Sequence, residues 1–391
     1  MFAVLHLPGA LRAFLPTLLG RSALAMAGLA LLLAVQKSTG SFADAGFASA
    51  AFGIANVVAA PWRARIIDRW GQRRALTSMA VAQSAAFVGL AVTAAAPHVP
   101  LLLFLVLSIA VGISAPPLGA AMRVLWASLT TVGDQRKKAF SLDAVAEELL
   151  FVAGPVVVAA IITATSASTA LLVTGLVVLI GTIGLTTSAV SGAQVGAVLT
   201  AMRSHRPLRQ PGFTRVLLVL VAVGGVLGVV EIAAPAVAEQ QAAVAASGWL
   251  LAAFAVGSAI GGVIYGHVHW KASLGVKLFI LCVSMGAAAV IVSQAGSLLL
   301  FAAGLVLLGL FLAPSLVTGY LVADAIVPEN SRTEASTWIN TAVNLGASLA
   351  AAAAGVLIDA SGSWLSLLLV GALAVAIASL VPFRRLRAIE G

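Results

Sequence analysis

Long apolar runs follow one another over nearly the whole chain, separated by short breaks that contain polar residues, glycine or proline. A helix rises about 1.5 Å per residue, so about 20 apolar residues cross the hydrocarbon core of a bilayer. Most of the runs have this length, and none alternates polar and apolar positions as the strands of a membrane barrel do. Because the backbone finds no water inside a bilayer, the pattern predicts transmembrane helices.

Twelve such runs are present, so the predicted fold class is an all-α membrane protein with twelve transmembrane helices. The expected spans are 13–35, 43–63, 75–96, 99–121, 140–163, 168–190, 214–237, 245–266, 273–294, 297–322, 334–358 and 363–382.

The two halves of the chain repeat each other weakly. The segment Gly112–Pro117 in the fourth span matches Gly309–Pro314 in the tenth, and Arg136–Ala139 before the fifth span matches Arg332–Ala335 before the eleventh. Only the connection 191–213 is long and polar enough to join two domains. Two parallel six-helix halves are the plan of one large class of transporters, which bind substrate between the halves.

The predicted organisation is therefore a six-helix bundle, a cytoplasmic linker and a second six-helix bundle, over residues 1–190, 191–213 and 214–391.

Composition agrees with a membrane protein. The chain is 61% hydrophobic and 9% charged, whereas a soluble domain has about 25% charged residues. The net charge of +9 could suggest a nucleic-acid partner, but its distribution argues against one. With the N-terminus in the cytoplasm, every Lys and Arg except Lys37 and Arg21 lies at a cytoplasmic end, Arg63 among them, as the positive-inside rule requires. We therefore expect a protein of the cell membrane with both termini in the cytoplasm and no nucleic-acid partner.

A charged loop follows the second span, with the sequence Ala-Arg-Ile-Ile-Asp-Arg-Trp-Gly-Gln-Arg-Arg-Ala-Leu over residues 64–76. Asp68 stands where it can face a helix N-terminus or an arginine. Gly71 permits a tight turn, and Arg69, Arg73 and Arg74 can bind acidic partners or lipid phosphates.

This loop resembles the signature G-x-L-x-D-R-x-G-R-R-x-x-L of the major facilitator superfamily, with Ala64 in place of the first glycine. Shorter stretches, such as Gly20-Arg21 and 231–235, resemble a group of bacterial, actinobacterial-type efflux proteins of that superfamily. The resemblance implies two six-helix bundles and transport by alternating access. The signature of drug antiporters in the fifth span is retained only as Gly154-Pro155. Antiport therefore remains the preferred mode of transport, but this signature gives it little support.

Charged residues inside the spans are candidates for function, because an Arg or Asp at a helix centre costs roughly 2.5–3.5 kcal/mol on insertion scales. Glu231 in the seventh span could bind and release a proton during transport, or form a structural hydrogen bond. Arg21 in the first span could bind an anionic substrate, neutralise an acid such as Glu147, or extend to the membrane surface. Glu147 and Glu148 are neighbours and project about 100° apart. One of them is expected to pair with Arg123 or Arg136, with a proton relay as the alternative.

Uncharged polar residues form a second group of candidates. Asn340 and Asn344 are four residues apart, so they share one face of the eleventh span and could line a cavity. Asn56, Gln83 and Trp338 are similar, weaker candidates.

We expect a cytoplasmic gate network of Asp68, Arg73, Arg332 and Glu334, whose formation and breakage accompany the transport cycle. Ordinary solvated loop charges are the alternative. The glycine pairs 224/228 and 257/261 are expected to permit close helix packing rather than to bind a ligand.

The favoured function is secondary active transport of a small molecule. The sequence has no ATP phosphate loop and none of the metalloprotease or serine-hydrolase motifs, so we expect neither an ATP-driven pump nor an enzyme. His267 and His269 do not share a helix face, and we expect no metal or cofactor, with a proton gradient as the driving force.

Within this class, proton-coupled efflux of an amphipathic or apolar compound is preferred. Nutrient uptake, lipid transport, and a transporter-like sensor or scaffold remain as alternatives. The expected partners are the substrate and the lipid bilayer, and the expected unit is a functional monomer.

Overall fold

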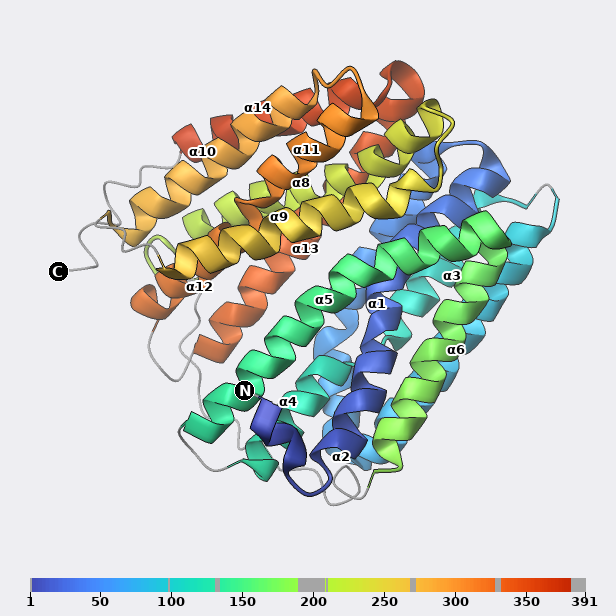
Figure 1. Cartoon of the computed structure of the whole chain (residues 1–391), viewed down its shortest axis with the longest axis vertical. Helices are drawn as coiled ribbons and strands as arrows, with labels where there is room; N and C mark the ends of the chain where they lie inside the picture. Colours follow the sequence, from blue (N-terminus) through green and yellow to red (C-terminus); the bar gives the residue numbers. More distant parts are fainter. Residues whose placement is uncertain are drawn as a thin grey trace. The chain divides into compact units, whose positions relative to one another are not determined.

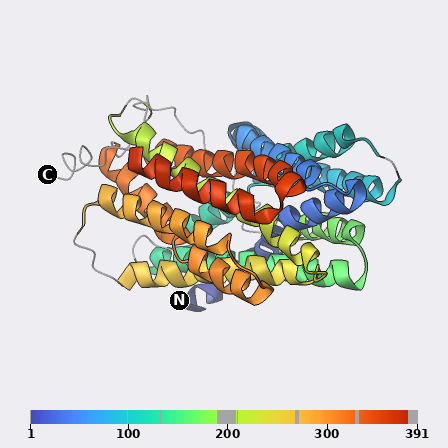
Figure 2. The same cartoon turned by 90° about the horizontal axis from the view of Figure 1, so that it is seen from above.

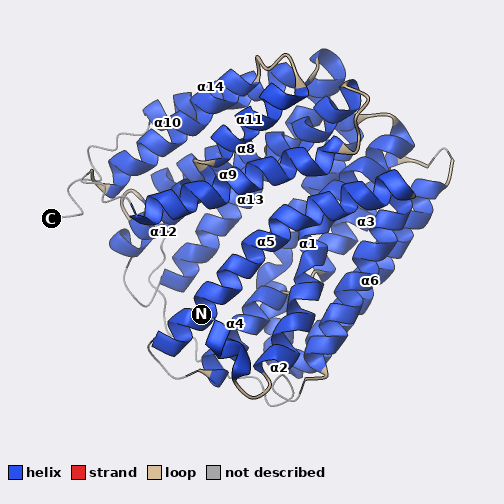
Figure 3. Cartoon of the chain, viewed as in Figure 1, coloured by secondary structure: helices blue, strands red, loops and turns tan. Residues whose placement is uncertain are grey.

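The computed structural model describes residues 2–97, 99–130, 134–188, 208, 210–267, 272–327 and 332–380. All regular structure among these residues is helical (Figure 3). The elements are a short 3-10 helix, Phe2–His6, and the helices α1 Ala10–Thr39, α2 Phe42–Ala95, α3 Leu101–Ser114, α4 Leu118–Leu129, α5 Asp134–Ala164, α6 Ala167–Thr186, α8 Phe213–Gln240, α9 Ala246–His267, α10 Leu274–Val292, α11 Leu298–Gly309, α12 Leu312–Ile326, α13 Arg332–Ser361 and α14 Ser363–Leu380 (Figure 1).

Among the described residues, eleven helical stretches are long and apolar enough to cross a membrane. The shorter apolar helix Ser363–Ser379 takes the place of the twelfth predicted span. The all-α membrane fold is therefore confirmed, and most predicted spans end within a few residues of the helices found. The predicted linker 191–213 falls largely outside the described residues, so its conformation is not described.

Helix α2 contains two of the spans, Phe42–Ile67 and Arg69–Ala95. The chain turns between them at Gly71, where φ is 76° and ψ is 159°. A positive φ is costly for residues with a Cβ atom, so a glycine is needed here. The turn that the charged loop predicted is therefore present, although the charged loop itself is mostly helical.

Two spans are broken near their middle. The fourth consists of α3 and α4, interrupted at residues 115–117, and the tenth consists of α11 and α12, interrupted at residues 310–311. These breaks fall in or next to the segments Gly112–Pro117 and Gly309–Pro314 that repeat in the sequence. The repeat therefore marks equivalent interruptions of two helices.

The chain forms two compact units. The N-terminal unit contains residues 1–40 and 54–199, and in it α1 packs against α4, α5 and α6. The C-terminal unit contains residues 41–53 and 200–391. In this unit α8 packs against α13 and α14, and α10 lies beside α14 (Figure 2). Helices α1 and α8 are the most buried spans of their units.

Glycines allow α8 to approach α13 closely. A Cβ atom at Gly224 would collide with the backbone carbonyl of Val343, and one at Gly228 with that of Ala347. Gly257 and Gly261 of α9 face the backbone carbonyls of Val306 and Leu310 in the same way. The prediction that both glycine pairs serve helix packing is confirmed.

Asp359, near the end of α13, caps the first turn of α2. Its carboxylate accepts hydrogen bonds from the backbone N–H groups of Phe42 and Ala43, both at 2.9 Å, and from the Ser41 hydroxyl at 2.6 Å. The first N–H groups of a helix have no partner inside the helix, and a carboxylate there also meets the positive end of the helix dipole. All four residues belong to the C-terminal unit, so the contact fixes the first turn of α2 within it.

We expect Asp359→Ala to lower the free energy of unfolding by about 0.5–2 kcal/mol, the usual loss for a removed N-terminal cap. Asp359→Asn should lose less, because the amide oxygen still accepts a hydrogen bond. Thermal unfolding in detergent measures both changes. Asp44→Ala is the control, since Asp44 lies in the same helical turn but its carboxylate has no hydrogen bond to another described residue. Equal losses for Asp359→Ala and Asp44→Ala would contradict the capping role.

Candidate functional site

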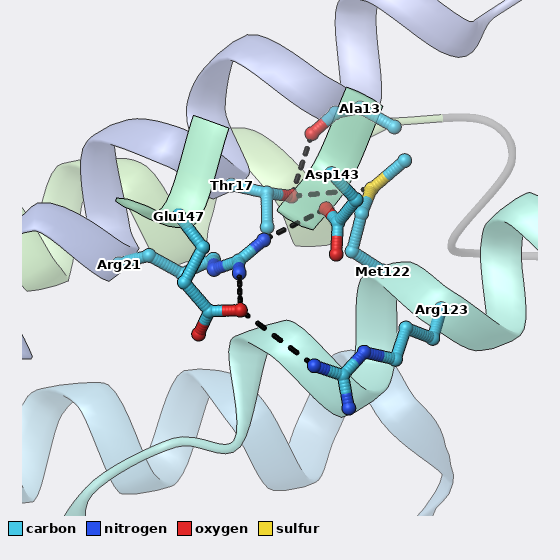
Figure 4. Close-up of polar contacts among 7 residues, drawn as sticks. All are labelled: Ala13, Thr17, Arg21, Met122, Arg123, Asp143 and Glu147. Atoms are coloured by element: carbon cyan, nitrogen blue, oxygen red, sulfur yellow. Dashed lines mark hydrogen bonds and ion pairs between the residues drawn. The ribbon is translucent and has the colours of Figure 1, made fainter. Parts of the chain in front are cut away.

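The centre of the site is Arg21 of α1, which lies in the apolar interior of the N-terminal unit. Its side chain is 7% exposed. Nη1 donates to Oδ1 of Asp143 at 2.7 Å, and Nη2 lies 2.6 Å from Oε2 of Glu147 (Figure 4). Asp143 and Glu147 are four residues apart on α5, so both face α1 from one side of that helix. The spacing explains how one guanidinium meets two carboxylates.

Arg123 of α4 extends the network from the outside. Its Nη2 lies 3.6 Å from the same oxygen of Glu147 that meets Arg21, and its side chain is 60% exposed. Glu147 is therefore shared between a buried and an exposed arginine, and its own side chain is 33% exposed (Figure 4). The four side chains carry two positive and two negative formal charges, so the network is neutral as a whole.

Packing beside the network holds α1 in register with α4. Thr17, one turn before Arg21, donates to the Ala13 carbonyl at 2.7 Å and contacts the Met122 sulfur (Figure 4). The rings of Phe14 and Trp126 have their centroids 5.4 Å apart. Arg21 therefore projects from a rigid part of the core.

A cavity of about 220 Å³ opens beside Arg21 within the N-terminal unit. Its polar lining consists of Arg21, Asn56, Arg63, Gln83 and Glu147. The remaining lining is apolar and includes the break between α3 and α4. A concave apolar surface with a few convergent polar groups is the usual form of a small-molecule site.

The ion pairs that the sequence suggested are present in part. Arg21 meets Glu147, as one interpretation of Arg21 expected, and Glu147 meets Arg123. Arg136 instead donates to the backbone carbonyls of Ala127 and Thr130 and so fixes the end of α4. Glu148 is exposed and forms no ion pair with another described residue.

Two residues of the site were not predicted. Asp143 is the nearest partner of Arg21, and the signal for it was its position one helical turn before Glu147. Arg63 was expected among the basic residues of the cytoplasmic ends, yet it is only 7% exposed. Its position at a cytoplasmic end stays a prediction, whereas the burial of its guanidinium against the broken fourth span was not predicted.

The C-terminal unit carries the other predicted candidates. Asn340 accepts a hydrogen bond from the Tyr320 hydroxyl at 2.8 Å, and the Asn344 side chain donates to the Asn340 carbonyl at 2.7 Å. Both asparagines and Glu231 are exposed in this unit, and Trp338 is half-buried. Asn340 and Asn344 thus share an exposed polar face of α13, as their spacing predicted.

The predicted gate network is only partly described. The side chains of Asp68 and Arg332 lie outside the described residues, so their partners are not stated. Arg69, Arg73 and Arg74 are exposed, and Glu334 is half-buried. The gate network remains a prediction. Over the described part of the chain, no group of three or more His, Cys, Asp or Glu side chains is placed to hold a metal ion.

Comparison with known proteins fits this architecture. The sequence model of the Major Facilitator Superfamily matches residues 14–229 and 216–390. The chain therefore belongs to that superfamily, and it is a multi-pass membrane protein and a secondary transporter rather than an enzyme. The narrower resemblance to actinobacterial-type efflux proteins stays a prediction. No curated protein sequence matches the chain.

Solved structures of transporters share the fold. The nucleoside transporter NupG is similar with a TM-score of 0.76 and 12% identity, over 97% of this chain and 98% of that one. The POT family transporter PepTSo has a TM-score of 0.75 and 11% identity, over 98% of both chains. An auto-inhibited POT family peptide transporter has a TM-score of 0.71 and 13% identity, over 95% of this chain and 96% of that one. At such low identities the likeness shows the fold alone.

Proposed function

We propose that this protein is a proton-coupled secondary transporter of the cell membrane that exports a small amphipathic compound by alternating access, with both termini in the cytoplasm and the monomer as the functional unit. The observation that carries the proposal is the charge network beside the cavity of the N-terminal unit. A structural ion pair would need one acid for Arg21, whereas two acids meet it and one of them lines the cavity.

Glu147 is the proposed proton carrier in this unit. Asp143 is 3% exposed, whereas Glu147 is 33% exposed and lines the cavity, so protons reach Glu147 more easily. Protonation of Glu147 would weaken its contacts with Arg21 and Arg123 and leave one positive charge uncompensated in the network. Such a change in net charge is a way to couple proton binding to the state of the cavity. Glu231, an exposed carboxylate within the apolar α8, is the second proposed proton carrier.

Purified protein in liposomes with an internal pH-sensitive dye tests the proposal. We expect at least one compound from a panel of small amphipathic molecules to move protons, and we expect Glu147→Gln to reduce this signal at least tenfold. Counterflow of the same compound in labelled form should persist in Glu147→Gln, because exchange needs no net proton movement. Glu148→Gln is the matched control and should behave as the wild type.

The sign of the proton movement separates export from the alternatives. Protons that move against the compound support antiport and export, whereas protons that move with it support uptake by symport. Counterflow without any proton movement supports facilitated transport. If no compound moves protons, and Glu147→Gln and Glu231→Gln exchange the compound as the wild type does, proton coupling is wrong. If no compound exchanges at all, the hypothesis of a transporter-like sensor or scaffold explains the results better.

A further inference from the structure

The break in the fourth span leaves backbone carbonyl groups without helical partners. Pro116 and Pro117 have no N–H group, so the carbonyls four residues earlier lose their hydrogen bonds. The Gly112 carbonyl, four residues before Pro116, instead accepts from Nη1 of Arg63 at 2.9 Å. The Val111 carbonyl, in the last turn of α3, accepts from Nε2 of Gln83 at 3.2 Å. Two side chains therefore satisfy neighbouring carbonyls, and one of them is neutral. A glutamine at position 63 would be sufficient if the residue only had to donate a hydrogen bond to the Gly112 carbonyl.

The charge of Arg63 is not matched by an acid in the described part of the chain. Nη2 donates to the Asn56 carbonyl at 2.7 Å, while Nε is buried and has no hydrogen-bond partner. The residue is 7% exposed and lines the cavity. Arg21, by contrast, is met by two carboxylates. A buried positive charge without a counter-ion is costly, so Arg63 would stabilise an anion bound in the cavity beside it.

The N-terminus of α4 opens on the same cavity. Helix α4 begins at Leu118 after Pro117, has no side-chain cap, and lines the cavity with residues 116–120. The backbone N–H groups of Leu118 and Ala121 donate to the carbonyls of Pro116 and Pro117. For the first-turn N–H groups of Gly119 and Ala120, no hydrogen bond to another described residue is found. Free N–H groups at the positive end of a helix dipole bind anions.

Gly119 keeps this approach open. A Cβ atom there would lie 3.7 Å from Nε of Arg21, so the missing side chain leaves space between the helix terminus and the guanidinium. The cavity has a volume of about 220 Å³. That space suits a small head group, and Leu24, Leu150, Phe151 and Val178 line it with apolar surface.

We propose that the cavity of the N-terminal unit binds a carboxylate group of an amphipathic substrate, with the positive charge of Arg63 and the first-turn N–H groups of Gly119 and Ala120 as its partners. This inference rests on the proposed transport function and names the class of its substrate. A carboxylate has two oxygens that accept from a guanidinium and from backbone N–H groups at once. Its charge offsets that of Arg63, and its apolar body contacts the leucine and phenylalanine side chains.

Binding to the purified full-length protein in detergent tests the inference without any transport. The probes are the monocarboxylates acetate to octanoate and benzoate, each beside its uncharged amide, and binding is measured by calorimetry and by thermal stabilisation. We expect one or more carboxylates to bind at least tenfold more tightly than the matching amides. Arg63→Gln should weaken that binding at least tenfold while the fold is retained, because glutamine can still donate to the Gly112 carbonyl. Arg63→Lys should restore part of the affinity.

Arg65→Gln is the matched control, since Arg65 lies two residues away on the same helix and is exposed. It should bind as the wild type does. If Arg63→Gln does not fold, Gly119→Val decides instead, because its side chain fills the space at the α4 N-terminus without removing a charge. The inference is overturned if amides bind as well as carboxylates, if Arg63→Gln and Arg65→Gln change binding equally, or if Gly119→Val binds as the wild type does.

The two proposals fail separately. Transport of another compound without any binding of carboxylates contradicts the substrate class and leaves the transport function intact. Binding of carboxylates without exchange of any compound in liposomes contradicts the transport function and leaves the site intact.

Discussion

We expect Arg21→Met to lower the free energy of unfolding by about 3–5 kcal/mol, the loss found when one partner of a buried ion pair is removed. The reason is the pair of carboxylates that would remain. Asp143 is 3% exposed and loses its contact at 2.7 Å, and Glu147 loses its contact at 2.6 Å. Methionine fills most of the space of the arginine stem, so lost packing contributes little. Thermal unfolding in detergent, followed by tryptophan fluorescence, measures the effect.

Arg123→Met is the matched control for Arg21→Met. It removes an arginine from the same carboxylate, but Arg123 is 60% exposed and its contact is 3.6 Å long. Exposed ion pairs contribute about 0–1 kcal/mol, so this variant should remain close to the wild type in stability.

The combination of Arg21→Met with Asp143→Asn and Glu147→Gln should recover more than half of the lost stability, because no uncompensated buried charge then remains. Proton-coupled transport should stay absent in the combined variant. Arg21→Met that unfolds as the wild type does, or a combined variant less stable than Arg21→Met alone, would contradict the view that charge balance holds α1 to α5.

The second large loss of stability is expected for substitutions at the contact between α8 and α13. Gly228→Ala should lower the free energy of unfolding by about 1–3 kcal/mol, the usual cost of overpacking, because the added Cβ atom collides with the Ala347 carbonyl. Gly224→Ala meets the Val343 carbonyl in the same way. The two glycines lie on one helix face against the same partner helix, so one shift of that helix relieves both collisions and the double substitution should cost less than the sum of the single ones.

Gly225→Ala on the same helix controls for helix propensity, which favours alanine over glycine by about 1 kcal/mol in every one of these variants. A Cβ atom at Gly225 would lie 3.6 Å from the Val370 side chain and 3.7 Å from the Ala350 side chain, which is ordinary contact. This variant should therefore be as stable as the wild type or more so. Equal unfolding temperatures for Gly225→Ala and Gly228→Ala would show that α8 and α13 tolerate a wider separation.

Features that depend on the local residue pattern were predictable from the sequence alone. The spans follow from the length of the apolar runs, because lipid forces each run to satisfy its own backbone hydrogen bonds. The turn at Gly71 follows from a residue type that tolerates unusual backbone geometry, whereas the break at Pro116 and Pro117 was not predicted, because the apolar run continues through it. The close contacts of Gly224 and Gly228 follow from their spacing on one face.

Which side chains meet depends on how the helices pack, and the sequence pattern did not predict it. Arg21 and Asp143 are 122 positions apart, and Asp359 caps a helix more than 300 positions earlier. Such pairs depend on the rotation of each helix about its axis and on its neighbours, which the apolar pattern leaves open when lipid and protein faces are equally hydrophobic. Arg63 shows the same limit, because its position near the end of a span does not reveal that its guanidinium packs against the broken fourth span. The helices of this transporter are therefore predictable from its sequence, whereas its site depends on how the helices pack.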